Sequence, residues 1–151
     1  MKSIKNLLIM GISFTCLALS SAAAYAEDHP HYLHALSDLR AARAHIDKLG
    51  NERVNKEEER AMRQTEDAIR EIKKASIDDH KDLNDHPPVD AGKDRVGRLH
   101  RALELLDSAK NDCSKEEDNG KSVGLQGRIL THIDKAHRDV EKAIEAESKH
   151  K

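Results

Sequence analysis

Apolar residues recur every three or four positions along four segments of this chain, a spacing typical of amphipathic α-helices. The segments cover approximately residues 31–49, 56–79, 93–117 and 122–147. No segment alternates apolar and polar residues with a period of two, as a half-buried strand would. The pattern therefore predicts an all-α protein, in which many of the core positions are alanine and bury little area.

Turn-forming residues separate the four segments. Gly50-Asn51 and Asn119-Gly120 mark short connections, and Asn55 is a candidate N-cap for the second helix. Pro87-Pro88 prevents a continuous helix in a longer connection over about 79–92. Two short connections and one longer one predict an antiparallel four-helix bundle with up-down-up-down order.

The two halves of the chain are similar. The segment 36–39 parallels 103–106, and 68–75 parallels 136–143, at offsets of 67 and 68 residues. A duplicated helical hairpin explains this similarity, and so does convergence of helices rich in Ala, Lys and Glu. The sequence leaves both explanations open.

The first 26 residues have the three parts of a secretory signal peptide. Lys2 and Lys5 precede an apolar stretch over 7–19, and Ala24-Tyr25-Ala26 forms a cleavage site. The apolar stretch is too short for a stable membrane span. We therefore expect a signal peptide over 1–26, cleavage after Ala26, one domain over 27–151, and a periplasmic or secreted location.

The composition of the mature chain argues against binding of nucleic acids and against a binding site lined by aromatic residues. Without Lys2 and Lys5, the 26 basic residues become 24 against 28 acidic ones, a formal charge of −4. This acidic balance argues against nucleic-acid binding. Tyr32 is the only aromatic residue after residue 26. Cys113, the only cysteine left, shares the apolar face of the third helix and is expected to be a core residue.

Ten histidines are the most informative feature of the composition. In an up-down-up-down bundle the chain start, the long connection and the chain end share one pole, which places seven histidines at or near that end. Imidazole with carboxylate suits Cu, Ni, Zn or Co as divalent ions. The expected metal ligands are His29, His31, His34, His86 and His100, with Asp85 or Asp90 assisting.

Other interpretations of the histidines remain open. They are equally consistent with polar surface positions, because no spacing matches a closed zinc site.

Asp134-x-x-His137 is a single near match to a di-iron motif, and no haem attachment motif or catalytic motif is present. We therefore expect no enzyme. The main alternative to metal binding is a metal-independent interaction or chaperone-like module, with a protein partner or a second copy.

Three segments carry a resemblance to other proteins: Pro30-His-Tyr-Leu-His-Ala-Leu-Ser-Asp-Leu-Arg40, Asp85-His-Pro-Pro-Val-Asp90 and the segment 98–107. They resemble those of a group of small exported bacterial helical proteins. This resemblance implies a secreted helical protein and implies no activity. In histidine content and helicity the chain is also similar, in a general way, to periplasmic small metal-binding proteins, although it lacks their regularly spaced histidine repeats.

Overall fold

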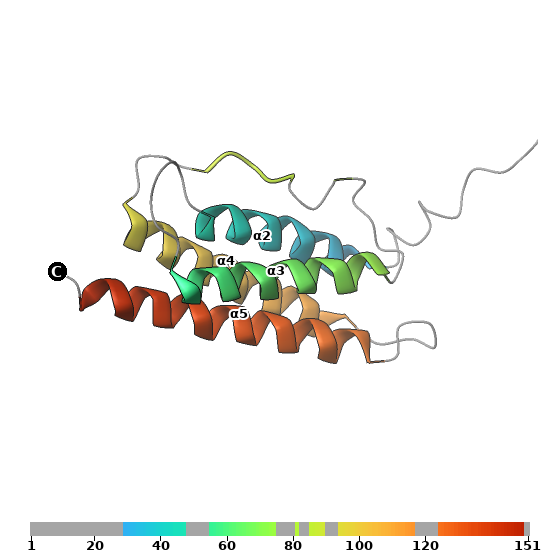
Figure 1. The fold of residues 1–151 in the computed structure, drawn as a ribbon. Helices are drawn as coiled ribbons and strands as arrows, with labels where there is room; N and C mark the ends of the chain where they lie inside the picture. Colours follow the sequence, from blue (N-terminus) through green and yellow to red (C-terminus); the bar gives the residue numbers. More distant parts are fainter. Residues whose placement is uncertain are drawn as a thin grey trace, which may run out of the picture.

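The computed structural model describes residues 29–47, 55–74, 81, 85–89, 94–116 and 124–149. These contain four helices: α2 (Pro30–Ile46), α3 (Lys56–Lys74), α4 (Arg95–Lys115) and α5 (Leu125–Ser148). The all-α four-helix bundle that the pattern predicts is confirmed, and the helices lie side by side along one long axis (Figure 1). The predicted signal peptide lies outside the described residues, as does the end of the second predicted helix over 75–79.

Two of the helices begin with a side-chain cap, and a third begins after a left-handed glycine. The Asn55 side chain accepts the Glu58 backbone N–H at 2.8 Å, and the Glu58 carboxylate accepts the Asn55 backbone N–H at 3.0 Å. This reciprocal capping box confirms Asn55 as the N-cap of α3. Asp94 caps α4 by accepting the Gly97 backbone N–H at 2.8 Å. Gly124 precedes α5 with φ 71°, a left-handed conformation that favours glycine.

The apolar stripes of all four helices pack together and form one hydrophobic core between the helices. Cys113 is fully buried, as its place on the α4 stripe predicts. Alanines at the helix contacts are fully buried too, and they let the helix backbones approach closely: Ala35, Ala42, Ala61, Ala68, Ala102, Ala109, Ala136 and Ala143. None of the leucine, isoleucine, valine, methionine or tyrosine side chains of the four described helices is exposed.

Side-chain contacts show which helix ends share a pole. The start of α2 meets the end of α4, where His29 Nδ1 lies 3.0 Å from Glu116 Oε2. At the opposite pole Arg95, which begins α4, donates to both carboxylate oxygens of Glu58 near the start of α3, at 2.9 and 2.6 Å. Arg95 also pairs at 3.0 Å with Glu147, near the end of α5. Helices α3 and α4 are therefore parallel, and α2 and α5 run the other way.

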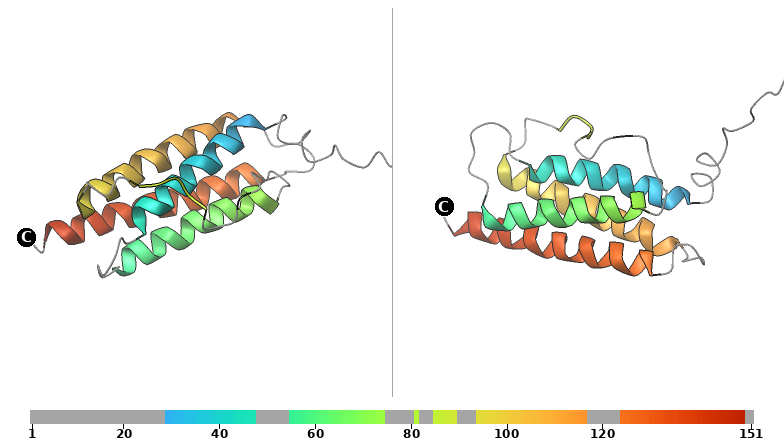
Figure 2. Two further views of the ribbon diagram at one scale, coloured as in Figure 1. Left: turned by 90° about the horizontal axis from the view of Figure 1, so that it is seen from above. Right: turned by 45° about the vertical axis from the view of Figure 1, so that its right-hand side comes forward.

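The order of helix directions is thus up-down-down-up, which differs from the expected up-down-up-down. Each helix packs against two neighbours: α2 against α3 and α4, and α5 against α3 and α4. The connection from α3 to α4 therefore has to pass from one pole to the other. Its described segment 85–89 passes above α2 in Figure 1 and in the right-hand view of Figure 2. Lys81 and Asp85 both contact Arg40 of that helix.

Arg40 accounts for this path. The residue is 1% exposed, and its guanidinium donates to the backbone carbonyls of Lys81 at 3.1 Å and Asp85 at 3.0 Å. A buried guanidinium must satisfy its N–H groups, and carbonyls of a passing segment can do so. The prolines exclude a helix here, and these two hydrogen bonds hold the connection against the side of α2.

Candidate functional site

The first turn of α2 begins without a cap of its own. Pro30 suits the first helical position because it has no N–H to satisfy, and the His29 side chain makes no capping hydrogen bond. Glu116 from α4 supplies the missing acceptor. Its Oε1 accepts the backbone N–H groups of His31 at 2.9 Å and Tyr32 at 3.4 Å. The start of α2 and the end of α4 are joined in this way.

Three of the predicted ligands, His29, His31 and His34, meet at this pole. His31 and His34 are three residues apart on α2, and their ring centroids are 6.4 Å apart with the rings nearly perpendicular. His31 Nδ1 lies 3.9 Å from Asp112 Oδ1 on α4. This nitrogen is buried and has no hydrogen-bond partner. Two imidazoles and one carboxylate therefore lie close together where the start of α2 packs against the end of α4.

The other predicted ligands lie elsewhere, so the expected convergence of the histidines is wrong. Asp85 and His86 are exposed on the connection, beside Arg40 and about 15 Å along α2 from its start, at 1.5 Å per residue. His86 Nδ1 lies 3.0 Å from the Pro87 carbonyl oxygen. His100 is exposed near the start of α4, at the opposite pole. Asp90 lies outside the described residues, together with His80 and His150.

The reason is the direction of α4. In the expected order the long connection would have stayed at the pole where α2 begins. Because α4 runs parallel to α3, its start and His100 are carried to the far end of the bundle. Within the described residues, no group of three or more His, Cys, Asp or Glu side chains is already arranged to hold a metal ion.

His29 is engaged in the junction of α2 with α4. It is 9% exposed, its Nδ1 contacts Glu116, and its ring centroid lies 5.8 Å from that of Tyr32. Cys113 is not available either, since burial, with smaller contributions from Asp112 and Glu116, raises the pKa of its thiol to about 12. A thiol that keeps its proton is a poor metal ligand. This pole therefore leaves His31, His34 and Asp112 as candidate ligands.

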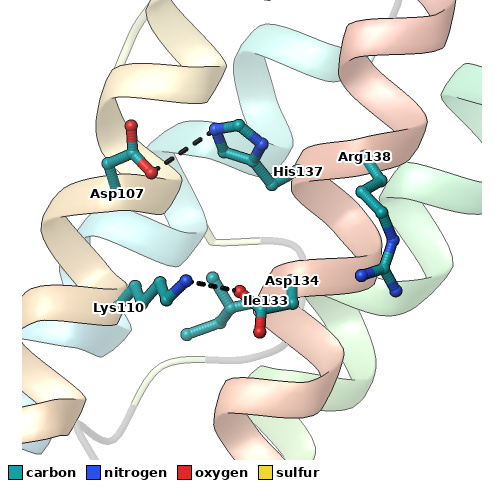
Figure 3. Close-up of a pocket in the computed structure, with 6 residues that line it drawn as sticks. All are labelled: Asp107, Lys110, Ile133, Asp134, His137 and Arg138. Carbon is teal, nitrogen blue, oxygen red and sulfur yellow. Dashed lines mark ion pairs between the residues drawn. The ribbon is translucent and has the colours of Figure 1, made fainter.

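A second histidine site, which the sequence-based reasoning did not select, lies between α4 and α5. His137 points from α5 toward Asp107 on α4, at the edge of a hollow of about 310 Å³ (Figure 3). His137 Nε2 lies 3.4 Å from Asp107 Oδ1, and its Nδ1 lies 3.6 Å from Glu141 Oε2. The two carboxylates flank opposite ring nitrogens, so they cannot bind one ion together with this imidazole.

Basic side chains also occupy this hollow. Lys110 pairs with Asp134 at 2.8 Å, which raises the pKa of the lysine, and Arg138 points away from that pair (Figure 3). The side chains that line the hollow therefore form ion pairs between α4 and α5. The Asp134-x-x-His137 spacing was the signal for it in the sequence, and in the structure Asp134 pairs with Lys110.

Comparisons with known proteins do not identify the chain. It matches no family model, no curated protein and no solved structure. None of the described helices is both long enough and apolar enough to cross a membrane.

Proposed function

We propose that this protein is a non-enzymatic helical bundle that binds a divalent transition metal ion between the start of α2 and the end of α4. The ligands are His31, His34 and Asp112. This site is smaller than the one that the sequence predicts, and Asp112 is new to it. The single observation that carries the proposal is the buried, unpartnered Nδ1 of His31, which faces the Asp112 carboxylate at 3.9 Å.

The spacing of these atoms suits a bridging ion. A separation of 3.9 Å between His31 Nδ1 and Asp112 Oδ1 is too long for a hydrogen bond. Bonds of about 2.1 Å to a tetrahedral ion place two ligand atoms about 3.4 Å apart, so a shift of about 0.5 Å suffices. His34 is exposed and free to turn its ring toward the same ion. Water completes the coordination of an open site of this kind.

The local charges also favour a cation. Asp112 and Glu116 lie in or next to the last turn of α4, where the helix dipole adds partial negative charge. Lys115, whose side chain is 45% exposed, donates to Asp112 Oδ1 at 2.9 Å and occupies that carboxylate when no metal is bound. A divalent ion that binds two imidazoles as well would displace this lysine. The ion therefore competes with a single exposed ion pair, which is a weak competitor.

The role we propose is buffering, sequestration or sensing of metal outside the cytoplasm. The location rests on the signal peptide that the sequence predicts over 1–26. Imidazole and carboxylate ligands favour Cu(II) in intrinsic affinity, followed by Ni(II) and Zn(II) or Co(II).

Calorimetric titration of the untagged protein with Cu(II), Ni(II) and Zn(II) tests the proposal. The double variant His31→Gln/His34→Gln should lower the affinity at least tenfold. The matched control His86→Gln/His100→Gln also removes two histidines, and it should bind as the wild type does. Lys115→Ala should bind more tightly, because it frees Asp112.

Two results would overturn the proposal. Equal binding by the His31/His34 variant would show that the site is wrong. No binding by the wild type, together with a chelator-insensitive oligomer in light scattering, would favour the interaction module instead.

A further inference from the structure

The end of α4 holds His31 by two separate contacts. Asp112 and Glu116 are four residues apart and therefore occupy the same face of α4, one turn apart. Asp112 faces the His31 ring, and Glu116 accepts the His31 backbone N–H at 2.9 Å. One stretch of α4 therefore determines both where the His31 backbone lies and which carboxylate its ring meets.

Glu116 is itself held firmly. Its side chain is 7% exposed, and its second oxygen lies 3.0 Å from His29 Nδ1. Gln126, in the first turn of α5, donates its side-chain N–H groups to the backbone carbonyls of Glu116 at 2.5 Å and Cys113 at 3.0 Å. These bonds satisfy the Glu116 carbonyl at the end of α4 and add a second donor to the Cys113 carbonyl, which also accepts the Glu116 backbone N–H at 3.3 Å. Three helices thus meet at the Glu116 carboxylate and backbone.

The alternative partners for the first turn of α2 are poor. The N–H groups of His31 and Tyr32 precede the first intrahelical hydrogen bonds, and the His29 side chain does not cap them. Without Glu116 this turn would lose the acceptor that orders it, and the His31 ring would lose its fixed approach to Asp112. A site with few ligands depends strongly on such ordering, because binding would otherwise have to order the turn as well.

We infer that Glu116 is the positioning residue of this site: it fixes the first turn of α2 so that the His31 ring faces Asp112, and metal binding depends on it without its touching the ion. This inference rests on the proposed function, because it concerns the same ion. The inference also gives α5 a role, because Gln126 holds the backbone of Glu116 in place. The ligands themselves lie only on α2 and α4.

The test compares Glu116→Ala, Glu116→Gln and the control Glu104→Ala, an exposed glutamate of the same helix. Calorimetry with Cu(II) and Zn(II) gives the affinity, and amide hydrogen exchange reports the His31 and Tyr32 N–H groups. Loss of an outer partner typically costs about tenfold or more in metal affinity, and we expect this for Glu116→Ala. Glu116→Gln keeps an oxygen acceptor, so it should restore binding to within about threefold of the wild type and restore amide protection.

The outcomes separate the two proposals. If the wild type binds no metal, the proposed function is wrong. If the wild type binds and Glu116→Ala binds equally well, the positioning role is wrong, even where the two amides exchange faster. Should Glu116→Ala fail to fold, Gln126→Ala provides the same comparison, with an expected loss of affinity smaller than tenfold; unchanged binding by Gln126→Ala would then overturn the role.

Discussion

Arg40 is the largest fully buried side chain among the described residues, and it is a charged one. Its neighbours Leu36 and Leu39 are core residues by pattern, whereas Arg40 lies on the flank of α2 that the connection covers. Helical periodicity places it outside the apolar stripe and so predicts an exposed residue. The passage of Lys81 and Asp85 over this flank, where their backbone carbonyls accept hydrogen bonds from Arg40, contributes to its burial.

Arg40→Ala is therefore expected to reduce the free energy of unfolding by about 2 to 4 kcal/mol, since it removes two hydrogen bonds from a charged donor. Arg40→Lys should reduce the free energy of unfolding by nearly as much, because one ammonium group does not reproduce the two guanidinium hydrogen bonds to separate carbonyls. Arg101→Ala, an exposed arginine of α4, should change stability by less than about 0.5 kcal/mol. Urea unfolding followed by circular dichroism measures all three. An Arg40→Ala protein as stable as Arg101→Ala would contradict the anchoring role.

Cys113 makes stability depend on pH in the alkaline range. Its pKa is raised to about 12, chiefly by burial, whereas in the unfolded chain it is about 8.5. Below the unfolded value both states keep the proton. Between the two values the unfolded chain loses the proton first, so the free energy of unfolding falls by up to about 1.4 kcal/mol per pH unit.

We accordingly expect the wild type to lose about 1.5 kcal/mol more than Cys113→Ala between pH 8.5 and pH 10. Lysine and tyrosine titration affects both proteins alike, and the difference between them isolates the thiol. Denaturant titrations at four or five pH values give the two slopes. Parallel slopes would show that the thiol titrates equally in both states.

At the scale of the elements, the acidic end of α4 is the most instructive feature. Glu116 at a helix C-terminus is unfavourable when α4 is considered alone, because the dipole there is negative. In the bundle the same carboxylate lies at the start of α2, where N–H groups and the positive end of the dipole favour it. The charge that is unfavourable for one helix is thus the cap of another.

The start of α5 provides a matched pair of glycines. Gly124 has φ 71°, and a Cβ there would lie 3.2 Å from Arg128 Nη1, whereas a Cβ at Gly127 meets nothing within 4 Å. Gly124→Ala should cost about 1 to 2 kcal/mol because of the left-handed backbone. Gly127→Ala should stabilise the protein by about 0.5 kcal/mol or more, because it restricts the unfolded chain. Thermal unfolding of the two variants should therefore shift in opposite directions, and shifts of the same sign would refute the assignment of the α5 start.

For the whole molecule, the packing matches that of two equivalent hairpins related by a twofold axis across the bundle. Helix α2 packs antiparallel to α4, and α3 packs antiparallel to α5. Two pairs of positions at the offset of 68 are fully buried in both halves: Ala68 with Ala136, and Ile72 with Val140. This arrangement is consistent with a duplicated hairpin.

The up-down-down-up order makes a prediction about the length of the connection between α3 and α4. The connection has to span approximately the length of α3, which is about 28 Å for 19 residues. A four-residue link in place of 75–94 reaches only about 14 Å and should abolish cooperative unfolding. A Gly/Ser link of the original length should retain the helical circular dichroism and a cooperative transition. A short-link variant that folds as the wild type does would support up-down-up-down order instead.

The sequence by itself determined the four helices, the faces they bury, the burial of Cys113 and the cap at Asn55. These properties depend on periodicity and on contacts within one or two turns, so a single segment contains the information. Only the tertiary structure decided the direction of α4, and with it which histidines meet. That direction depends on the path of the long connection between α3 and α4. Arg40, a buried residue of α2, anchors this connection. His31 and His34 therefore lie beside Asp112, while His86 and His100 lie elsewhere on the molecule.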